Sequence, residues 1–208
     1  MKINKYSVGI LLLVVVVYYS VNLKKLDEVK AGYIEKEFDV ETYALEFWDT
    51  KLQDAINESI DINLIINGLK SNPENTFETY AQQLGISKVH HFMVKGNGVI
   101  NAITEEYMEV SVDEGSVNIA TEFIFGNSVR DSSGKVNINE FENLMDFNMV
   151  SVAINKQIRE NIIPQLVGRA IIGQKIEFVG AVEVNEENME NLILRIILVQ
   201  STASNDRN

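Results

Sequence analysis

The chain has 208 residues, of which 46% are hydrophobic and 23% are charged, and its formal net charge at pH 7 is −12. This composition indicates a folded protein with a buried core and excludes a chain that is disordered along its whole length. The sequence contains no cysteine, which excludes disulfides, thiol catalysis and cysteine-bound zinc. The acidic balance also argues against nucleic acid as a partner, because binding to phosphate backbones depends on lysine and arginine.

The amino terminus has the plan of a membrane-targeting segment. Two lysines precede an apolar run over residues 8–21, a length that is typical of a signal peptide. The stretch "VYYSVN" lacks small residues at the usual cleavage spacing, so we expect residues 1–23 to remain as a signal anchor or transmembrane segment. Residues 3–23 would then cross the cell membrane once and leave the acidic domain on the extracytoplasmic side. The charged residues 24–37 lack periodicity, which is typical of a stalk.

Residues 38–86 are predicted to form a helical subdomain. Asp39 is placed to cap a first long helix over "VETYALEFWDTKLQDAINESI", and a second helix is expected to start at Asp61. Asn72 is the expected cap of a third helix, with a proline at its first position and Gly85 after its end.

The hydrophobic period changes to two from Val89 onward, which predicts strands. A long first strand contains Gly96 and Gly98, which indicate a bend or bulge because no helix follows them to form a phosphate loop. The five predicted strands are "VHHFMVKGNGVINAI", "YMEVSV", "VNIATEFIF", "QKIEFVGAVEV" and "NLILRIILVQ".

A long helix is predicted between the third and fourth strands, from about residue 140 to residue 161, with Pro164 ending or kinking it. Three strands, a helix and two strands are the order of an OB-type five-stranded β-barrel. The expected fold class is therefore α+β, with an OB-like barrel at residues 87–201 and a disordered tail at residues 202–208. An open α+β sheet is the alternative.

The stretch "VRDSSGKVNINEF" resembles the second half of a calcium-binding EF-hand loop. If Gly134 is the obligatory glycine of such a loop, Glu140 takes the closing position, but Val129 takes the first position and has no oxygen ligand to offer. The preceding residues also read as a strand instead of the helix that enters an EF-hand. We therefore predict no metal site.

The same stretch is better explained as a turn, a short strand and a helix cap. Asp131 and Gly134 are typical of a tight turn, and residues 136–138 alternate as a strand would. Asn139 followed by Glu142 fits a variant of the capping box at the start of the long helix.

The sequence shows no motif of a known catalytic site. His90 and His91 are adjacent in a predicted strand, so their rings should face opposite sides and cannot share a metal. One of the two is expected to be partly buried and the other solvated. Paired carboxylates lie in predicted turns, where solvation explains them. We predict no catalytic residue and no cofactor, and the chain is interpreted as a non-enzyme.

Several long segments resemble a bacterial family of predicted periplasmic lipoproteins, domain of unknown function 2291. The similar segments are "FDVETYALEFWDTKL", "VKGNGVI", "VRDSSGKVNINEFENLMDFNMVSVAIN" and "GQKIEFVGAVEV". In the third segment the shared positions include Arg130, Asp131 and Gly134, followed by Asn143 and Asn155. The chain departs from the lipoprotein pattern because it has no cysteine to carry a lipid, so the apolar segment itself would provide the anchor.

Members of that family are often encoded beside components of sugar ABC transporters, and the resemblance therefore implies an accessory or binding role in carbohydrate uptake. A sugar-binding protein or an ABC permease would be the partner, and Arg130 and Asp131, with Asn143 and Asn155 as polar neighbours, would be the binding cluster. The structural alternative for the charged pair is an ion pair that holds the turn to the helix. Two other functions stay open: an envelope hydrolase whose active site has no sequence signature, and a structural or assembly protein of the cell envelope.

Overall fold

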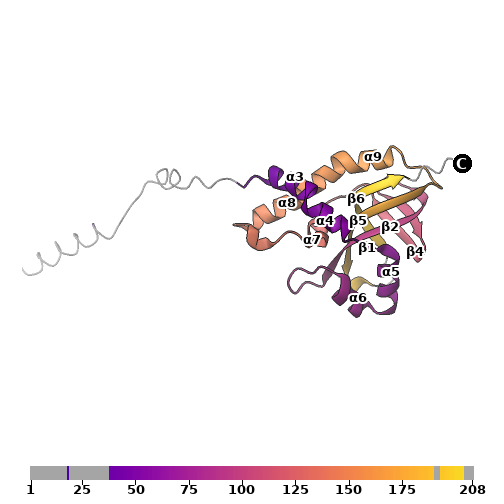
Figure 1. Cartoon of the computed structure of the whole chain (residues 1–208), viewed down its shortest axis with the longest axis horizontal. Helices are drawn as coiled ribbons and strands as arrows, with labels where there is room; N and C mark the ends of the chain where they lie inside the picture. The colour runs from indigo at the N-terminus through magenta and orange to yellow at the C-terminus, as the bar shows by residue number, and fades with distance from the viewer. Residues whose placement is uncertain (1–17, 19–37, 190–192, 204–208) are drawn as a thin grey trace, which may run out of the picture. The chain divides into compact units, whose positions relative to one another are not determined.

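The computed structural model describes residues 18, 38–189 and 193–203 (Figure 1). The predicted signal anchor at residues 1–23 and stalk at residues 24–37 lie outside this part of the chain, apart from residue 18. Within the described ranges, no helix is both long and apolar enough to cross a membrane.

Five strands close into a barrel, and a sixth short strand is added beside β2. Neighbouring strands follow the order β2-β3-β4-β6-β5, and β5 pairs with β2 to complete the circle. All pairs in this circle are antiparallel except β4 and β6, which run parallel. The predicted sequence of three strands followed by two is confirmed, and the open-sheet alternative is wrong. The strands are β1 (Ile60–Asp61), β2 (Val89–Ile103), β3 (Tyr107–Val112), β4 (Gly115–Ala120), β5 (Lys175–Asn185) and β6 (Leu194–Ala203).

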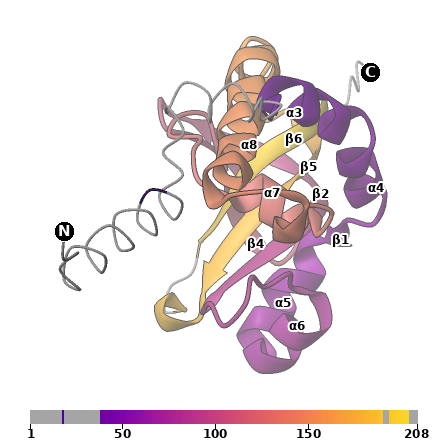
Figure 2. The same ribbon diagram turned by 90° about the vertical axis from the view of Figure 1, so that its left-hand side faces the viewer.

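The helices gather around this barrel. Figures 1 and 2 show α5 and α6 together at one end of the barrel, while α3, α4, α7 and α8 lie beside its opposite part. The helices are α3 (Val40–Asp49), α4 (Lys51–Asn57), α5 (Ile62–Ser71), α6 (Pro73–Tyr80), α7 (Ser128–Ser133), α8 (Leu144–Gln157) and α9 (Ile163–Val167). Single turns of other helix types are η1 (Ile138–Glu140), η2 (Ile158–Ile162) and η3 (Glu186–Asn188).

One hydrophobic core joins the barrel to the helix α5. The inward-facing strand residues Phe92, Val110 and Ile196 have no exposed surface, and neither do Ile62 and Ile65 of α5. Burying each such side chain stabilises the fold by about 1.5–3 kcal/mol. Because residues from Asp39 onward form one compact unit, the predicted helical subdomain at 38–86 is part of the barrel domain.

The predicted caps Asp39 and Asn72 are confirmed, and the second helix begins directly after Asp61, which is its N-cap, but two of the predicted helices are shorter than expected. Asp39, Asp61 and Asn72 each accept a hydrogen bond from a backbone N–H in the first turn of α3, α5 and α6. The first helix breaks at Thr50. The Thr50 hydroxyl donates a hydrogen bond to the carbonyl of Glu46 and so competes with backbone N–H groups for that acceptor.

The third helix ends at Tyr80, well before Gly85, because the next residues pair with the barrel. The backbone N–H and carbonyl of Gln82 exchange hydrogen bonds of 2.8 and 2.9 Å with His91 of β2. Tertiary pairing therefore overrides the helical periodicity of residues 81–84.

The connection between β4 and the long helix differs from its prediction. The predicted turn and strand are replaced by the helix α7, which Gly134 ends in the left-handed conformation with a φ of +63°, and by the 3-10 turn η1. The capping box consists of Asn137 and Glu140 on η1. The prediction that Asn139 and Glu142 cap the long helix is wrong.

The long helix begins at Leu144, and its N-cap is Asn143, whose side chain accepts from the N–H of Asp146 at 2.9 Å. A π-helical turn, η2, interrupts the helix just before Pro164. Pro164 has no N–H to donate to the carbonyl four residues earlier, and a wider turn accommodates its ring. At the predicted kink near Pro164, the chain therefore changes from an α-helix to a π-helical turn.

The long strand β2 serves two neighbours because two glycines let it bend. It pairs with β5 from Val89 to Val99 and with β3 from Val99 to Ile103, with a bulge after Ile100. A methyl group on Gly98 would lie 2.2 Å from the carbonyl oxygen of Ser111 on β3, a distance that no real contact tolerates. At the predicted bend, the backbones of β2 and β3 therefore approach each other closely.

We expect Gly98→Ala to destabilise the protein by about 1–3 kcal/mol, because the added methyl group must push β3 away from β2. Chemical denaturation of the full chain measures this change. Asn97→Ala is the matched control, since Asn97 is the exposed neighbour of Gly98 in the same strand, and it should shift stability by about 0.5 kcal/mol or less. Equal effects of the two substitutions would contradict the proposed clash.

Candidate functional site

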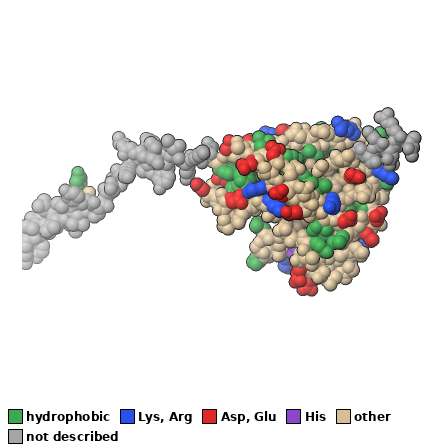
Figure 3. All heavy atoms as spheres, in the orientation of Figure 1, with side chains coloured by type: hydrophobic (Ala, Val, Ile, Leu, Met, Phe, Trp, Pro, Cys, Tyr) green, Lys and Arg blue, Asp and Glu red, His purple; other side chains and the backbone are tan. Residues whose placement is uncertain are grey.

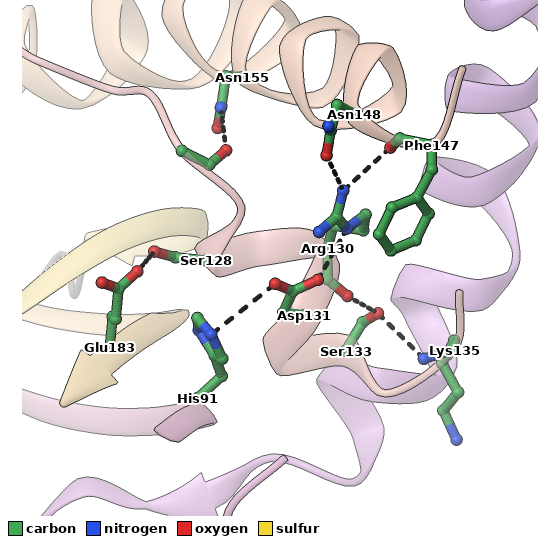
Figure 4. A network of polar contacts seen from close by, with 11 residues as sticks. His91, Ser128, Arg130, Asp131, Ser133, Lys135, Phe147, Asn148, Asn155 and Glu183 are labelled. Carbon is green, nitrogen blue, oxygen red and sulfur yellow. Dashed lines mark hydrogen bonds and ion pairs between the residues drawn. The ribbon is translucent and has the colours of Figure 1, made fainter. Parts of the chain in front are cut away.

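Arg130 is the largest fully buried side chain of the described residues, with 2% of its surface exposed. Its Nε donates to Oδ1 of Asp131 at 2.7 Å, and its NH1 donates to the carbonyl of Phe147 on α8 at 3.0 Å. The guanidinium carbon also lies 3.6 Å from the centre of the Phe147 ring, a cation–π arrangement. Figure 4 shows the side chain between α7 and α8, so Arg130 joins these two helices.

Asp131 extends this network to the barrel. Its Oδ2 lies 3.7 Å from Nε2 of His91 on β2, and Figure 4 shows the two side chains facing each other. Across the β2–β5 ladder, Glu183 stands opposite His91 and accepts a hydrogen bond of 3.0 Å from the hydroxyl of Ser128. The hydrogen bond from Ser128 to Glu183 therefore holds α7 against the barrel wall, and Asp131 faces His91 beside it.

Burial lowers the pKa of His91, and the carboxylates of Asp131 and Glu183 only partly counter this effect. The ring is accordingly neutral at pH 7. Its Nδ1 is buried and has no hydrogen-bond partner among the described residues. The expectation that one of the two histidines would be solvated is wrong, since His90 and His91 are 5% and 6% exposed, although their rings do lie on opposite sides of β2, toward Glu186 and Asp131 respectively.

The structure brings together only part of the predicted binding cluster. Arg130 and Asp131 are in contact, and Asn155 of α8 is buried nearby, where its amide donates to the carbonyl of Gly126 at 2.8 Å. Asn143 is exposed at the start of α8 and serves as its cap. The side chains of Arg130 and Asp131 are 1% and 11% exposed, which leaves little surface for a ligand. Arg130 and Asp131 both belong to α7, so their ion pair lies within one helix, and the contact with α8 is made by the Arg130 guanidinium and Phe147.

A hollowed surface lies elsewhere, on the outside of the barrel where β2 bends. Two adjoining hollows of about 330 and 540 Å³ share Asn97 and Glu177 as lining residues. We call them together the barrel groove. Its polar lining side chains are Asp61, Lys95, Asn97, Ser111, Asp113, Lys175, Glu177, Gln200, Ser201 and Thr202.

The predictions from sequence did not include the barrel groove. Its residues come from five strands and one hairpin turn that are distant in the chain and meet only when the barrel closes. One signal was present: polar residues at alternate positions beside the strand glycines, such as Lys95 and Asn97, mark the outward face of β2.

Comparison with known proteins places the chain in a family and identifies a similar fold. The model of the family described as "Predicted periplasmic lipoprotein (DUF2291)" matches residues 11–200. The crystal structure of an OB-fold protein from Thermotoga maritima is similar with a TM-score of 0.72 and 25% sequence identity, covering 80% of this chain and 98% of that one. No curated protein matches the chain.

We expect Arg130→Met to destabilise the protein by about 3–5 kcal/mol, because it leaves the mostly buried carboxylate of Asp131 without its cation. Equilibrium unfolding in urea measures the loss. The double variant Arg130→Met/Asp131→Asn should recover part of it, since the uncompensated charge is then also removed.

The control for this experiment is Lys88→Met. Lys88 and Glu187 form an ion pair of 2.6 Å whose side chains are 65% and 62% exposed, and such a pair contributes about 0–1 kcal/mol. An Arg130→Met variant that is no less stable than Lys88→Met would refute the structural role of Arg130.

His91 should make the protein less stable in acid. Because its pKa is lowered in the folded state, the unfolded chain takes up the proton first, and stability is lost as the pH falls below about 6.5. His91→Asn removes this contribution, so the difference in unfolding free energy between wild type and variant should shrink from about pH 7 to pH 5. All carboxylates and His90 are present in both proteins, so their titration cancels in the comparison. A difference in unfolding free energy that does not change with pH would contradict the prediction.

Proposed function

Because the chain belongs to the DUF2291 family of predicted periplasmic lipoproteins, we propose that it is a membrane-anchored extracytoplasmic module that binds a saccharide in the barrel groove and assists carbohydrate uptake. Residues 3–23 provide the anchor in this proposal, and a sugar-binding protein or an ABC permease is the partner. The family is one of unknown function, so the assignment depends on the chemistry of the groove.

The barrel groove is the observation that carries the proposal. Its two hollows, of about 330 and 540 Å³, fall within the range of small-molecule sites. Its floor is rigid, because Asn97 and Glu177 stand opposite each other in the hydrogen-bonded ladder of β2 and β5. A ligand would therefore meet side chains whose positions are fixed by the barrel.

The groove offers hydrogen-bond donors and acceptors in alternation. Lys95 donates, Glu177 accepts, and the amides of Asn97 and Gln200 do both. A sugar hydroxyl also donates and accepts, so neighbouring hydroxyls can each find a complementary group. Charged groups of both signs line the same groove, which favours a neutral polyhydroxylated ligand over an anion or a cation.

The surface of the domain is compatible with such a ligand and not with nucleic acid. On the face in Figure 3, acidic and basic side chains are interspersed without a continuous basic patch. The net charge of −12 would repel a phosphate backbone.

The test is isothermal titration calorimetry of the full-length protein in detergent against a panel of neutral monosaccharides. We expect saturable binding of at least one sugar, and at least about a tenfold weaker affinity for Glu177→Ala, which loses a charged acceptor. Glu105→Ala is the matched control, because Glu105 is exposed in the β2–β3 turn and is not a lining residue of the groove. The absence of saturable heat with every sugar, or equal weakening by both substitutions, would refute saccharide binding in the groove.

A further inference from the structure

A further hollow, of about 660 Å³, lies where α6 faces the start of β2 and the turn η3. We call it the α6 cavity. Phe77, His90 and Met189 form its less polar wall, and Glu74, Glu78 and Glu186 supply carboxylates. It shares no lining residue with the barrel groove, so what it binds is independent of the function proposed above.

His90 is the fixed element of this cavity. The ring is 5% exposed and stacks on Phe77 with a centroid distance of 3.9 Å and an interplanar angle of 15°. Its Nε2 lies 2.5 Å from Oε1 of Glu186. Phe77 and Glu186 together thus hold the imidazole in one orientation.

The other ring nitrogen of His90 is Nδ1. Nδ1 is buried and makes no hydrogen bond within the described residues. When Nε2–H donates to the carboxylate of Glu186, Nδ1 carries a lone pair and can only accept. Because Nδ1 has almost no accessible surface, a ligand in the cavity does not reach it, and His90 contributes its ring to the cavity wall.

The charge of the cavity determines which kind of ligand it favours. Glu74 and Glu78 are one helical turn apart on α6 and so lie on the same face of the helix, and Glu186 adds a third carboxylate. None of the lining residues is lysine or arginine; the nearby Lys88 is paired with Glu187, outside the lining. The cavity therefore has a negative potential, which attracts a cationic ligand.

The arrangement favours an organic cation over a metal ion. In the part of the chain that the structure describes, no three His, Asp or Glu side chains converge closely enough to hold a metal. The carboxylates are distributed around an aromatic and thioether wall, which suits a ligand with a carbon body and one or more charged nitrogens.

We propose that the α6 cavity binds a small organic cation that carries amine or guanidinium groups. The carboxylates of Glu74 and Glu78 neutralise its charge, and its carbon chain lies against the wall formed by Phe77, His90 and Met189.

The experiment is calorimetric titration of the full-length protein in detergent with 1,4-diaminobutane and with agmatine, at about physiological salt so that weak surface attraction is screened. The neutral analogue 1,4-butanediol and Mg²⁺ serve as ligand controls. We expect saturable binding of at least one of the two amines and none of the diol. Glu74→Gln/Glu78→Gln should weaken amine binding at least about tenfold.

Glu187→Gln is the matched protein control. It removes one carboxylate beside the cavity without touching its lining and should change the affinity by less than about twofold. Three results would each overturn the proposal. They are no saturable binding of either amine, binding of Mg²⁺ as tight as that of the amines, and a loss of amine affinity in Glu187→Gln as large as that in Glu74→Gln/Glu78→Gln. Circular dichroism checks that the variants are folded. We expect them to be, because Glu74 and Glu78 are both exposed.

Discussion

The fold depends on the ability of one strand to pair with two different neighbours. β2 forms a ladder with β5 along its first eleven residues and with β3 along its last five, and without both pairings the sheet would have two open edges. The change of partner requires that β2 and β3 come closer than any side chain at Gly98 would permit. Backbone geometry at this point therefore determines whether the sheet closes.

The sites follow from the same strand. The barrel groove lies at the bend, where Asn97 points outward between two glycines. At the other end of β2, the alternation of side chains sends His90 toward α6 and His91 toward α7. One strand thus supplies a wall of the groove, a wall of the α6 cavity and the barrel side of the buried Arg130 network.

Arg130 shows how a short helix of low intrinsic stability can hold a fixed position. α7 has six residues, too few to be stable alone, and its guanidinium group is satisfied only when α8 supplies a carbonyl and an aromatic ring. Misplacing α7 would leave a buried charge without partners, which costs several kcal/mol. The network therefore favours one arrangement of α7, α8 and β2 over its alternatives.

Sequence patterns predicted those parts of the structure that depend on near neighbours. The caps Asp39 and Asn72 were recognisable because a cap acts on the residues immediately after it. The order of the strands was recognisable from their period of two. The patterns failed where distant residues decide: Gln82 leaves its helix to pair with His91, and a segment read as turn and strand becomes α7 because Arg130 is buried against α8.

The barrel groove and the α6 cavity were missed for the same reason, and the distance between them determines whether their charges interact. Glu177 of the barrel groove and Glu186 of the α6 cavity lie at opposite ends of β5, nine residues apart, which is about 30 Å along an extended strand. This distance is several times the Debye length of about 8 Å at physiological salt, so the charges of one hollow barely act on a ligand in the other. Coupling between the two would need a movement of β5 itself, which the ladders with β2 and β6 oppose along its length. The barrel therefore carries two chemically different hollows, one of mixed charge and one acidic, whose charges are largely screened from each other.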